Sequence, residues 1–381
     1  MSKKLLLLGG GHAQVHVLQA LAREPLAGAD VALITPFARQ LYSGMVPGLV
    51  AGHYRAEQCA IALQPLADAA RVRFIEGSAV ALDTAARRVT LADGRVADYD
   101  VLSLDTGAVM DRDQLPGARG HGLFVRPIEH FVRLLDGLLD LAARRVLDVV
   151  VIGGGAAGVE LALALQHRLA GRGEERARVA LVTGGPEPLA GYAPGVMQRT
   201  AQALARHKVT VFRDSCVALE RGAVVLGSGA RLACDAPLLA TGAQAPAWLL
   251  GSGLALDDRG FVLTGPTLQS PSHAEVFAAG DVATRADMPH AKSGVYAVRA
   301  GPALALNLRR FIGGGLLEPH VPQKRTLNLI SCGERRAIVS WGSLAAQGRW
   351  AWWWKDRIDR GFVARYGSAA VGAATEFNRS A

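Results

Sequence analysis

The sequence predicts an α/β protein in which two units with parallel strands follow one another along the chain. Residues 5–8 and 149–152 are short apolar runs typical of buried strands. A glycine cluster and a helix-length segment follow each run, and a second β-rich run comes next, at 31–35 and 179–183. The order strand, helix, strand implies parallel strands joined by a right-handed crossover. Its recurrence about 144 residues later indicates a weak internal duplication.

The segments around these units have the pattern of further short strands and turns. We expect the first helix to run to about Arg23 and the second to about Leu169. The pair Asp93-Gly94 is a tight-turn signal between two strands. Beyond residues 313–315 the composition changes, with five of the six tryptophans after residue 340, which indicates a third, smaller unit. The other expected strands are 72–75, 88–91 and 101–104 in the first half and 209–212, 223–226 and 237–240 in the second.

The composition is that of a folded protein with two or three domains. A chain of 381 residues exceeds one ordinary domain, and its 50% hydrophobic and 20% charged residues exclude a disordered chain. The formal net charge of +9 is compatible with nucleic acid, an anionic membrane or a phosphorylated cofactor. Because no RNA- or DNA-binding module is visible in the sequence, we expect no nucleic-acid partner.

The cysteine pattern favours a reducing compartment. The four cysteines are widely spaced and form no C-x-x-C, which excludes a zinc ribbon, a thioredoxin-type pair and a secreted disulfide scaffold. Only four apolar residues precede Gly9, and the apolar stretch 149–159 falls short of the ~20 residues of a membrane span. We therefore expect a cytoplasmic protein without a transmembrane helix. The cysteines are Cys59, Cys216, Cys234 and Cys332.

The two glycine clusters are candidate phosphate-binding loops. A glycine turn between a strand and a helix directs backbone N–H groups and the positive helix end at one point, where a pyrophosphate fits. In the second cluster Gly153, Gly155 and Gly158 complete the pattern G-x-G-x-x-G. The first cluster has two of the three glycines, with Gln14 in the third position. Both loops therefore predict nucleotide binding, the second more specifically.

The acidic residue that usually binds the nucleotide ribose is missing from both units. Thr35 ends the second strand of the first unit, and Thr183 ends that of the second. No arginine takes its place in the second unit. The sequence therefore does not distinguish NAD from NADP, and it leaves open whether the second unit binds a nicotinamide nucleotide at all.

Three further motifs connect the loops to a known family. Residues 105–107 read D-T-G and residues 240–242 read A-T-G, each at the end of an expected strand, and residues 275–281 read E-V-F-A-A-G-D. This set, in this order, resembles the two-dinucleotide-domain flavoprotein reductases of the pyridine nucleotide–disulfide oxidoreductase superfamily. The resemblance covers about residues 3–312.

Other segments narrow the resemblance to one branch of that superfamily. Disulfide reductases carry C-x-x-x-x-C where residues 40–48 read Q-L-Y-S-G-M-V-P-G, without a cysteine. The chain is thus more similar to type II NADH:quinone and sulfide:quinone oxidoreductases, and K-S-G at 292–294 resembles the K-T-G of the sulfide enzymes. Residues 9–13, 42–54 and 355–360 further resemble a bacterial subfamily that is found alone or fused to selenide, water dikinase.

The resemblance implies an α/β fold of two Rossmann-like FAD/NAD(P)-binding domains, the second inserted in the first, plus a small C-terminal α+β region. The FAD-binding domain would be discontinuous, comprising 1–110 and 263–315. The NAD(P)-binding-like domain would comprise 111–262, and the C-terminal domain 316–381.

The resemblance also implies which residues bind the nucleotides. The pyrophosphate of FAD would lie at Gly9, Gly11 and Ala13, and the carboxylate of Asp281 would hold the ribitol hydroxyls in charge-assisted hydrogen bonds. A turn or helix-capping role is the other interpretation of Asp281. The residues expected at FAD are Gly9, Gly11, His12, Ala13, Thr35, Pro36, Ser43, Val80, Thr106, Gly107, Gly280, Asp281, Lys292, Ser293 and Gly294. Those expected at NAD(P) are Gly153, Gly155, Gly158, Glu160, Thr241 and Gly242.

Two residues are candidates for catalysis. Lys292, beside the start of a helix near Ser293, could add positive charge near flavin N1, or it could be a solvated surface lysine. In related quinone reductases a glutamate matching Glu160 lies near nicotinamide and flavin and could pass protons to a quinone, although a helix-dipole partner is the alternative. No metal site is expected, because His12 and His16 have no third ligand. Sulfide oxidation needs two cysteines beside the flavin, and no such pair is evident.

The C-terminal segment 349–366 is a candidate for an interface helix. On a helical wheel Trp350, Trp354, Ile358, Phe362 and Tyr366 form one stripe. A tryptophan stripe with basic flanks suits a helix lying at the inner face of the cytoplasmic membrane. The alternatives are that the stripe covers the protein's own core or a partner in a homodimer.

These observations predict an FAD-dependent oxidoreductase with NAD(P)H as co-substrate. The expected reaction is electron transfer of the NAD(P)H:quinone type, with hydride transfer to flavin N5. Two alternatives stay open: an FAD oxidoreductase with a non-nicotinamide donor, such as a sulfur or selenium species, and a flavin-based redox sensor. The small-molecule donor and acceptor cannot be named from the sequence.

Overall fold

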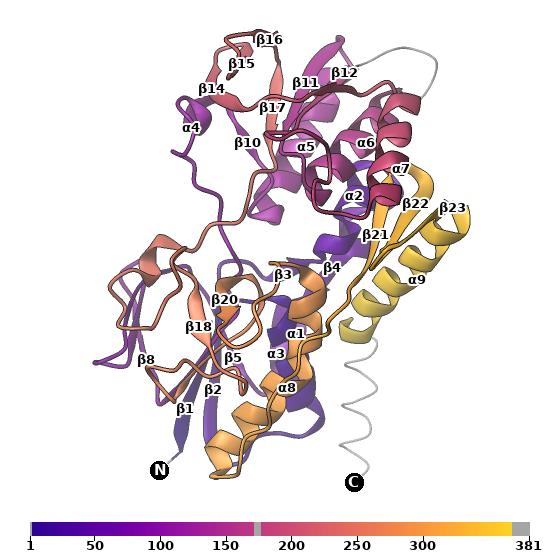
Figure 1. The fold of residues 1–381 in the computed structure, drawn as a ribbon. Helices are drawn as coiled ribbons and strands as arrows, with labels where there is room; N and C mark the ends of the chain where they lie inside the picture. The colour runs from indigo at the N-terminus through magenta and orange to yellow at the C-terminus, as the bar shows by residue number, and fades with distance from the viewer. Residues whose placement is uncertain (1, 171–176, 368–381) are drawn as a thin grey trace.

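A computed structural model describes residues 2–170 and 177–367, and two five-stranded parallel sheets dominate it (Figure 1). All neighbouring strands within each sheet are parallel, as the sequence predicts. The first sheet has the order β19 (Val276–Ala278), β9 (Val101–Leu104), β1 (Lys3–Leu8), β2 (Ala29–Thr35) and β5 (Arg73–Glu76). The second has the order β10 (Leu123–Phe124), β17 (Ala236–Leu239), β11 (Leu147–Ile152), β12 (Ala177–Val182) and β13 (Thr210–Phe212).

The first sheet joins segments that are far apart in the sequence. Strand β19 pairs with β9, and helix α8 (Gly294–Gly313), which follows it, packs against α1 (His12–Arg23). Helix α3 (Leu63–Ala69) also packs against α1. The predicted end of the first helix at Arg23 is confirmed. The exact domain limits given above stay predictions.

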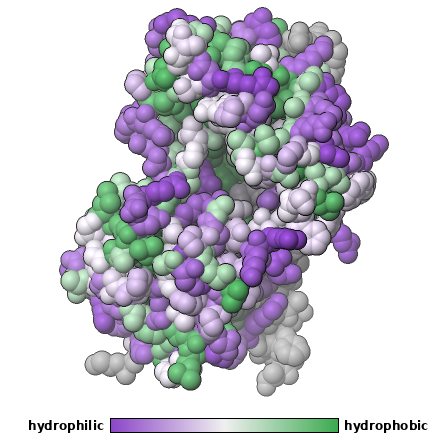
Figure 2. All heavy atoms as spheres, viewed as in Figure 1, coloured by the Kyte–Doolittle hydropathy of each residue, from purple (hydrophilic) through white to green (hydrophobic). Residues whose placement is uncertain are grey.

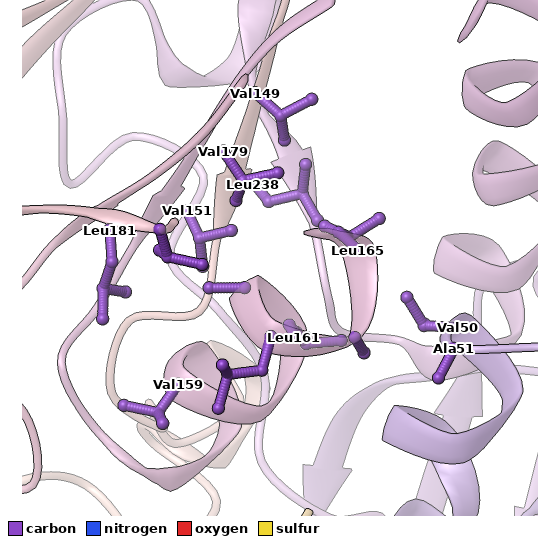
Figure 3. Packing of buried hydrophobic residues seen from close by; sticks show 14 of the residues in the cluster. Val50, Ala51, Val149, Val151, Val159, Leu161, Leu165, Val179, Leu181 and Leu238 are labelled. Atoms are coloured by element: carbon purple, nitrogen blue, oxygen red, sulfur yellow. The ribbon is translucent and has the colours of Figure 1, made fainter. Parts of the chain in front are cut away.

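A shared core connects the second sheet to the N-terminal part of the chain. Side chains such as Val149, Val151 and Leu238 point from the sheet toward helix α6 (Ala156–Ala170), whose Leu161 is buried against them (Figure 3). Val50 of the short helix α2 (Val46–Val50) lies in the same cluster. Burial of one such side chain contributes roughly 1.5–3 kcal/mol, so this cluster holds the two parts of the molecule together.

The C-terminal unit is an antiparallel sheet covered by one helix. Strands β21 (Leu327–Cys332), β22 (Glu334–Trp341) and β23 (Leu344–Gly348) pack against α9 (Arg349–Tyr366), and β21 also contacts α6. Figure 1 shows this unit beside α6 and α7 (Pro194–Arg206).

The tryptophan stripe predicted for α9 divides between two environments. Phe362 and Tyr366 are buried against the first unit, whereas Trp350, Trp354 and Ile358 are 54%, 41% and 43% exposed. The alternative that the stripe covers the protein's own core is therefore correct only for the C-terminal half of the helix.

The remaining elements are short. The other helices are α4 (Ala118–His121) and α5 (Ile128–Ala142), with single 3-10 turns at Ser43–Met45, Ala56–Cys59, Ala247–Leu249 and Gly280–Val282. The minor sheets contain β3 (Arg39–Leu41) and β4 (Ala60–Ala62); β6 (Ala79–Asp83), β7 (Arg88–Leu91) and β8 (Val96–Asp98); β14 (Cys216–Glu220), β15 (Ala223–Leu226) and β16 (Arg231–Ala233); and β18 (Val262–Thr264) and β20 (Ala283–Arg285). Among the described residues, no helix combines the length and apolar character that a membrane crossing needs.

Candidate functional site

A cavity of ≈ 380 Å³ opens at the carboxyl ends of the strands of the first sheet. Ligands of open parallel sheets bind at this edge, because the strand-to-helix loops converge there. The lower wall comes from the loops after β1, β2 and β9 and from the first turn of α8, and the upper wall from residues 126–129, Pro246 and Trp248. In the space-filling view of Figure 2, the molecule is hollowed at mid-height, between its upper and lower parts.

Asp105, at the end of β9, is the residue around which the first glycine loop is built. Its carboxylate is 2% exposed and accepts the backbone N–H groups of Ala13 at 2.8 Å and Gln14 at 3.0 Å. A Cβ on Gly11 would collide with this carboxylate, and one on Gly9 would collide with the Asp105 backbone. The glycines are therefore needed for the close approach of this strand end to the start of α1.

The environment of Asp105 also changes its titration. Burial raises the pKa of Asp105 to about 7, although the two N–H groups that it accepts oppose the shift. Asp281 lies close enough to raise the pKa further. Asp105 is absent from the residues predicted at FAD, although the motif that contains it was found in the sequence.

The loop retains free donors for a phosphate. Within the described residues, the N–H groups of Gly11 and His12 donate no hydrogen bond to the protein. They lie at the N-terminus of α1, and Gly294, at the N-terminus of α8, lines the same cavity. Two positive helix ends and open N–H groups suit the pyrophosphate of a dinucleotide. The residues present thus fit the cofactor that the sequence predicts.

Asp281 faces this cavity, but it has a partner that the sequence did not reveal. Its Oδ2 lies 3.0 Å from Nη1 of Arg126, and both residues line the cavity. The side chain of Asp281 is 14% exposed and that of Arg126 37%. Arg126 stands between β10 and α5, in an irregular segment with no motif, so no sequence signal could have placed it here.

Most of the residues predicted at FAD come together in the cavity. Ala13 is buried and Val80 is 48% exposed, and neither lines the cavity, although Ala79 does. Gly280 and Ser293 flank lining residues without lining the cavity themselves. The predicted residues that line it are Gly9, Gly11, His12, Thr35, Pro36, Ser43, Thr106, Gly107, Asp281 and Gly294.

His12 is held as a neutral side chain. Its Nδ1 lies 2.8 Å from Nε2 of Gln40, and its Nε2 lies 3.2 Å from Oγ of Ser43. Burial lowers the pKa of His12 to about 4. His12 thus contributes hydrogen bonding and packing at the cavity and carries no charge near neutral pH.

Lys292 lies outside the cavity lining. Its Nζ donates hydrogen bonds to the carbonyl oxygen of Ala283 and, at 2.8 Å, to Oγ1 of Thr284. The same ammonium lies 3.9 Å from the centre of the Phe261 ring, and burial lowers the pKa of Lys292 to about 8. The surroundings are therefore not those of a solvated surface lysine.

The second glycine loop has an open centre. A Cβ on Gly153, whose φ is +132°, would collide with the carbonyl of Ala240, and one on Gly158 would collide with Gly153. At Gly155, by contrast, a Cβ would meet no atom within 4 Å. Two glycines are thus required by the fold, whereas the middle one leaves space that a ligand can occupy. The predicted partners Thr241 and Gly242 follow β17, beside this loop.

Glu160 lies between the second sheet and the C-terminal unit, not at the cavity. Its Oε1 accepts the backbone N–H of Ser331 at 2.7 Å. Burial raises the pKa of Glu160 to about 7. The positive charge of Lys355 opposes this rise, whereas the negative charge of Asp359 raises the pKa further. Lys355 Nζ in turn donates to Oδ2 of Asp359 at 2.8 Å and to the carbonyl oxygen of Gly44 at 2.7 Å.

The sequence carried a signal for only part of this group of Glu160, Lys355 and Asp359, whose members are partly or fully buried. The last two belong to the segment K-D-R-I-D-R, which was noted as a subfamily motif without a role. Their spacing of four residues on one helix was the available signal. Their proximity to Glu160 depends on how α9 packs on the rest of the molecule.

The other candidate centres are not assembled. All four cysteines are free, and Cys332 is fully buried. In the part of the chain that the structure describes, no three His, Cys, Asp or Glu side chains are grouped as metal ligands.

Two parallel sheets, each with a glycine loop after its β1 or β11 strand, give the chain a fold of the two-dinucleotide-domain class. The profile of the family "Pyridine nucleotide-disulphide oxidoreductase" matches residues 3–301. The chain therefore belongs to this family.

Relatives in sequence include proteins named NADH dehydrogenase-like and a protein named as a quinone reductase. A NADH dehydrogenase-like protein of Mycobacterium tuberculosis is 32% identical over 244 residues, which cover 61% of this chain and 60% of that protein. The chain thus spans less than two thirds of that relative's length. Demethylphylloquinone reductase of Synechocystis is 26% identical over 298 residues, covering 74% and 72% of the two chains.

Solved structures share the whole fold at low identity. The sulfide:quinone oxidoreductase of Aquifex aeolicus superposes with a TM-score of 0.79 at 19% identity, covering 96% of this chain and 91% of that one. NDH2 of Plasmodium falciparum, solved in complex with NADH, gives a TM-score of 0.79 at 12% identity, covering 95% and 97%. These likenesses confirm the predicted fold class.

Proposed function

We propose that this protein is an FAD-dependent oxidoreductase that transfers electrons from NAD(P)H to a quinone. The observation that carries the proposal is the cavity of the first sheet, which brings together the Gly9–Gly11 turn, Thr106, Gly107 and Asp281 from three distant segments. The names of the sequence relatives, which include NADH dehydrogenase-like proteins and a quinone reductase, support the same assignment.

The protein's contribution is to bind and orient two nucleotides. Bound FAD would supply the redox chemistry by taking up a hydride from the nicotinamide and passing two electrons to the acceptor. Gly11 and His12 would hold its pyrophosphate with their N–H groups, and Asp281 would accept hydrogen bonds from its hydroxyls. The open loop at Gly155 would receive the pyrophosphate of the nicotinamide nucleotide.

Reduction of a quinone to a quinol also consumes two protons, and Glu160 is the group we assign to supply one of them. A carboxyl group whose pKa is near 7 is protonated in half of the molecules at neutral pH and can both give up and regain a proton. Lys355, beside it, would stabilise the carboxylate that remains after the proton has left.

The exposed half of α9 supports contact with the membrane that holds the quinone. Trp350, Trp353 and Trp354 are 54%, 58% and 41% exposed, and Ile358 continues the same surface. Exposed tryptophans on a protein of net charge +9 suit an anionic lipid interface. We propose that this tryptophan surface (350, 353, 354 and 358) lies against the inner face of the cytoplasmic membrane.

Anaerobic titration tests the reaction directly. NADH or NADPH should bleach the flavin absorbance of the FAD-loaded protein, and a soluble quinone should restore it rapidly. If neither nucleotide reduces the flavin while a sulfur or selenium donor does, the donor in the proposal is wrong. If every donor and acceptor reacts only at background rates, a redox-sensing role replaces catalysis.

A further inference from the structure

An ion pair stands beside the second glycine loop, where the sequence offers no ribose-binding acid. Glu187 lies in the loop that follows β12, and Arg213 follows β13 directly. The guanidinium binds the carboxylate through two hydrogen bonds, Nε to Oε1 at 3.1 Å and Nη2 to Oε2 at 3.3 Å. Both side chains are partly exposed, at 57% for Arg213 and 43% for Glu187, so a ligand can reach them.

The backbone attaches this loop to the glycine turn. The N–H of Leu189 donates to the carbonyl oxygen of Gly154 at 2.8 Å. The N–H of Gly154 in turn donates to the carbonyl oxygen of Thr183 at 3.2 Å. Because Glu187 is two residues from Leu189, their Cα atoms are at most about 7.6 Å apart. On the other side, the N–H of Gly184 donates to the carbonyl oxygen of Asp214 at 2.9 Å. The pair is therefore fixed at the edge of the turn.

Thr183, at the usual position of the ribose-binding acid, is engaged elsewhere. Its hydroxyl hydrogen-bonds to the carbonyl oxygen of Gly185, within its own loop, and lies 3.3 Å from that of Phe212. In nucleotide-binding sheets the ribose of the adenosine lies over the end of the second strand, which is β12 here. Glu187 is the carboxylate that the loop supplies at this end.

We propose that Glu187, held by Arg213, makes the second nucleotide site selective for NADH over NADPH. The inference rests on the proposed function and specifies which of the two nicotinamide nucleotides is the substrate. A ribose 2′-hydroxyl can donate a hydrogen bond to the carboxylate. A 2′-phosphate would place roughly two negative charges beside the carboxylate, and such like-charge contacts oppose binding. The Glu187 carboxylate occupies the Nε–Nη2 edge of the Arg213 guanidinium, so this edge is not free to bind that phosphate through two parallel hydrogen bonds.

Calorimetric titration of the FAD-loaded protein with NAD+ and NADP+ tests the assignment without turnover. We expect the wild type to bind NAD+ at least tenfold more tightly than NADP+. Glu187→Gln removes the repulsion and frees the Arg213 guanidinium, so it should reduce this ratio at least tenfold, mainly by tightening NADP+. Adding Arg213→Gln to this variant should remove the gain in NADP+ affinity.

Glu220→Gln is the matched control. Glu220 forms an exposed ion pair with Arg231 on the small sheet β14–β16, with the same 43% exposure as Glu187. The control should leave the ratio unchanged. A wild type that prefers NADP+, or a ratio that changes less than twofold in Glu187→Gln, overturns the assignment. If the wild type binds neither nucleotide, both this assignment and the nicotinamide part of the proposed function are overturned. If the nucleotides bind but Glu187→Gln leaves their affinity ratio unchanged, only the assignment is overturned and the proposed function stands.

Discussion

The carboxylate of Asp281 lies 3.0 Å from the guanidinium of Arg126, across a distance of 155 residues in the sequence. The two residues come from opposite walls of one cavity, since Asp281 follows β19 of the first sheet and Arg126 follows β10 of the second. The pair therefore joins the two sheets within the lining of the proposed flavin site.

Removal of this carboxylate should weaken FAD binding. Asp281→Ala takes away the acceptor proposed for the cofactor hydroxyls, and a lost charge-assisted hydrogen bond costs roughly 1.5–3 kcal/mol, or about 10- to 150-fold in affinity. The ratio of flavin to protein absorbance after purification measures the effect. Asp98→Asn, at an exposed ion pair with Arg88, is the control. Full flavin occupancy in Asp281→Ala would contradict the assigned role.

A valine at the open glycine should separate the two nucleotide sites. At Gly155 a Cβ meets no atom within 4 Å, so Gly155→Val is expected to fold normally and to fill the space proposed for the second nucleotide. Flavin content should stay at the wild-type level, while reduction by NADH or NADPH slows at least 100-fold in stopped-flow measurements. If Gly155→Val instead loses its FAD, the two loops have been assigned to the wrong nucleotides.

The reaction of the reduced protein with quinone should depend on the protonation of Glu160. Burial raises the pKa of Glu160 to about 7, so the carboxyl donor is present below that pH and is lost as the pH rises through it. The rate of flavin reoxidation should therefore fall above about pH 7. Glu160→Gln keeps an acceptor for Ser331 but has no proton to give, and it should lower that rate at least tenfold and remove the break near pH 7.

Reduction of the flavin by NADH provides the internal control for this variant. That step does not involve the acceptor, so at saturating NADH its rate should fall much less than the rate of reoxidation in Glu160→Gln, although Glu160 is also expected near the nicotinamide nucleotide. A wild-type pH profile that persists in the variant would assign the break to another group.

The tryptophan surface should control binding to lipid. Deletion of α9 would remove Trp352 and Phe362 from the core, so substitution of the exposed residues is the cleaner test. The triple variant Trp350→Gln, Trp353→Gln, Trp354→Gln should reduce cosedimentation with vesicles of anionic phospholipid at least tenfold. Leu250→Gln, 68% exposed on another part of the molecule, should have no effect. Unchanged partition of the triple variant would leave the membrane proposal without support.

The local pattern of the chain was sufficient for the sheets and the loops. Apolar runs followed by glycines predicted β1 and β11 with the helices after them, because a buried parallel strand and a phosphate loop each demand particular residues at adjacent positions. The same reasoning predicted α9 at 349–366, since its helical period is a local property. Most of the residues that the family motifs predicted at FAD line the cavity.

The tertiary structure decided what local pattern cannot encode. The pairs Arg126–Asp281 and Glu187–Arg213 are contacts between side chains on different elements, and the charge of Lys355 on α9 acts on Glu160 of α6. Sequence distance says nothing about such contacts, and burial, which sets the pKa of Glu160, exists only after the elements have packed. The sequence by itself thus determined which kinds of loop this protein carries, and packing determined which charges meet around them.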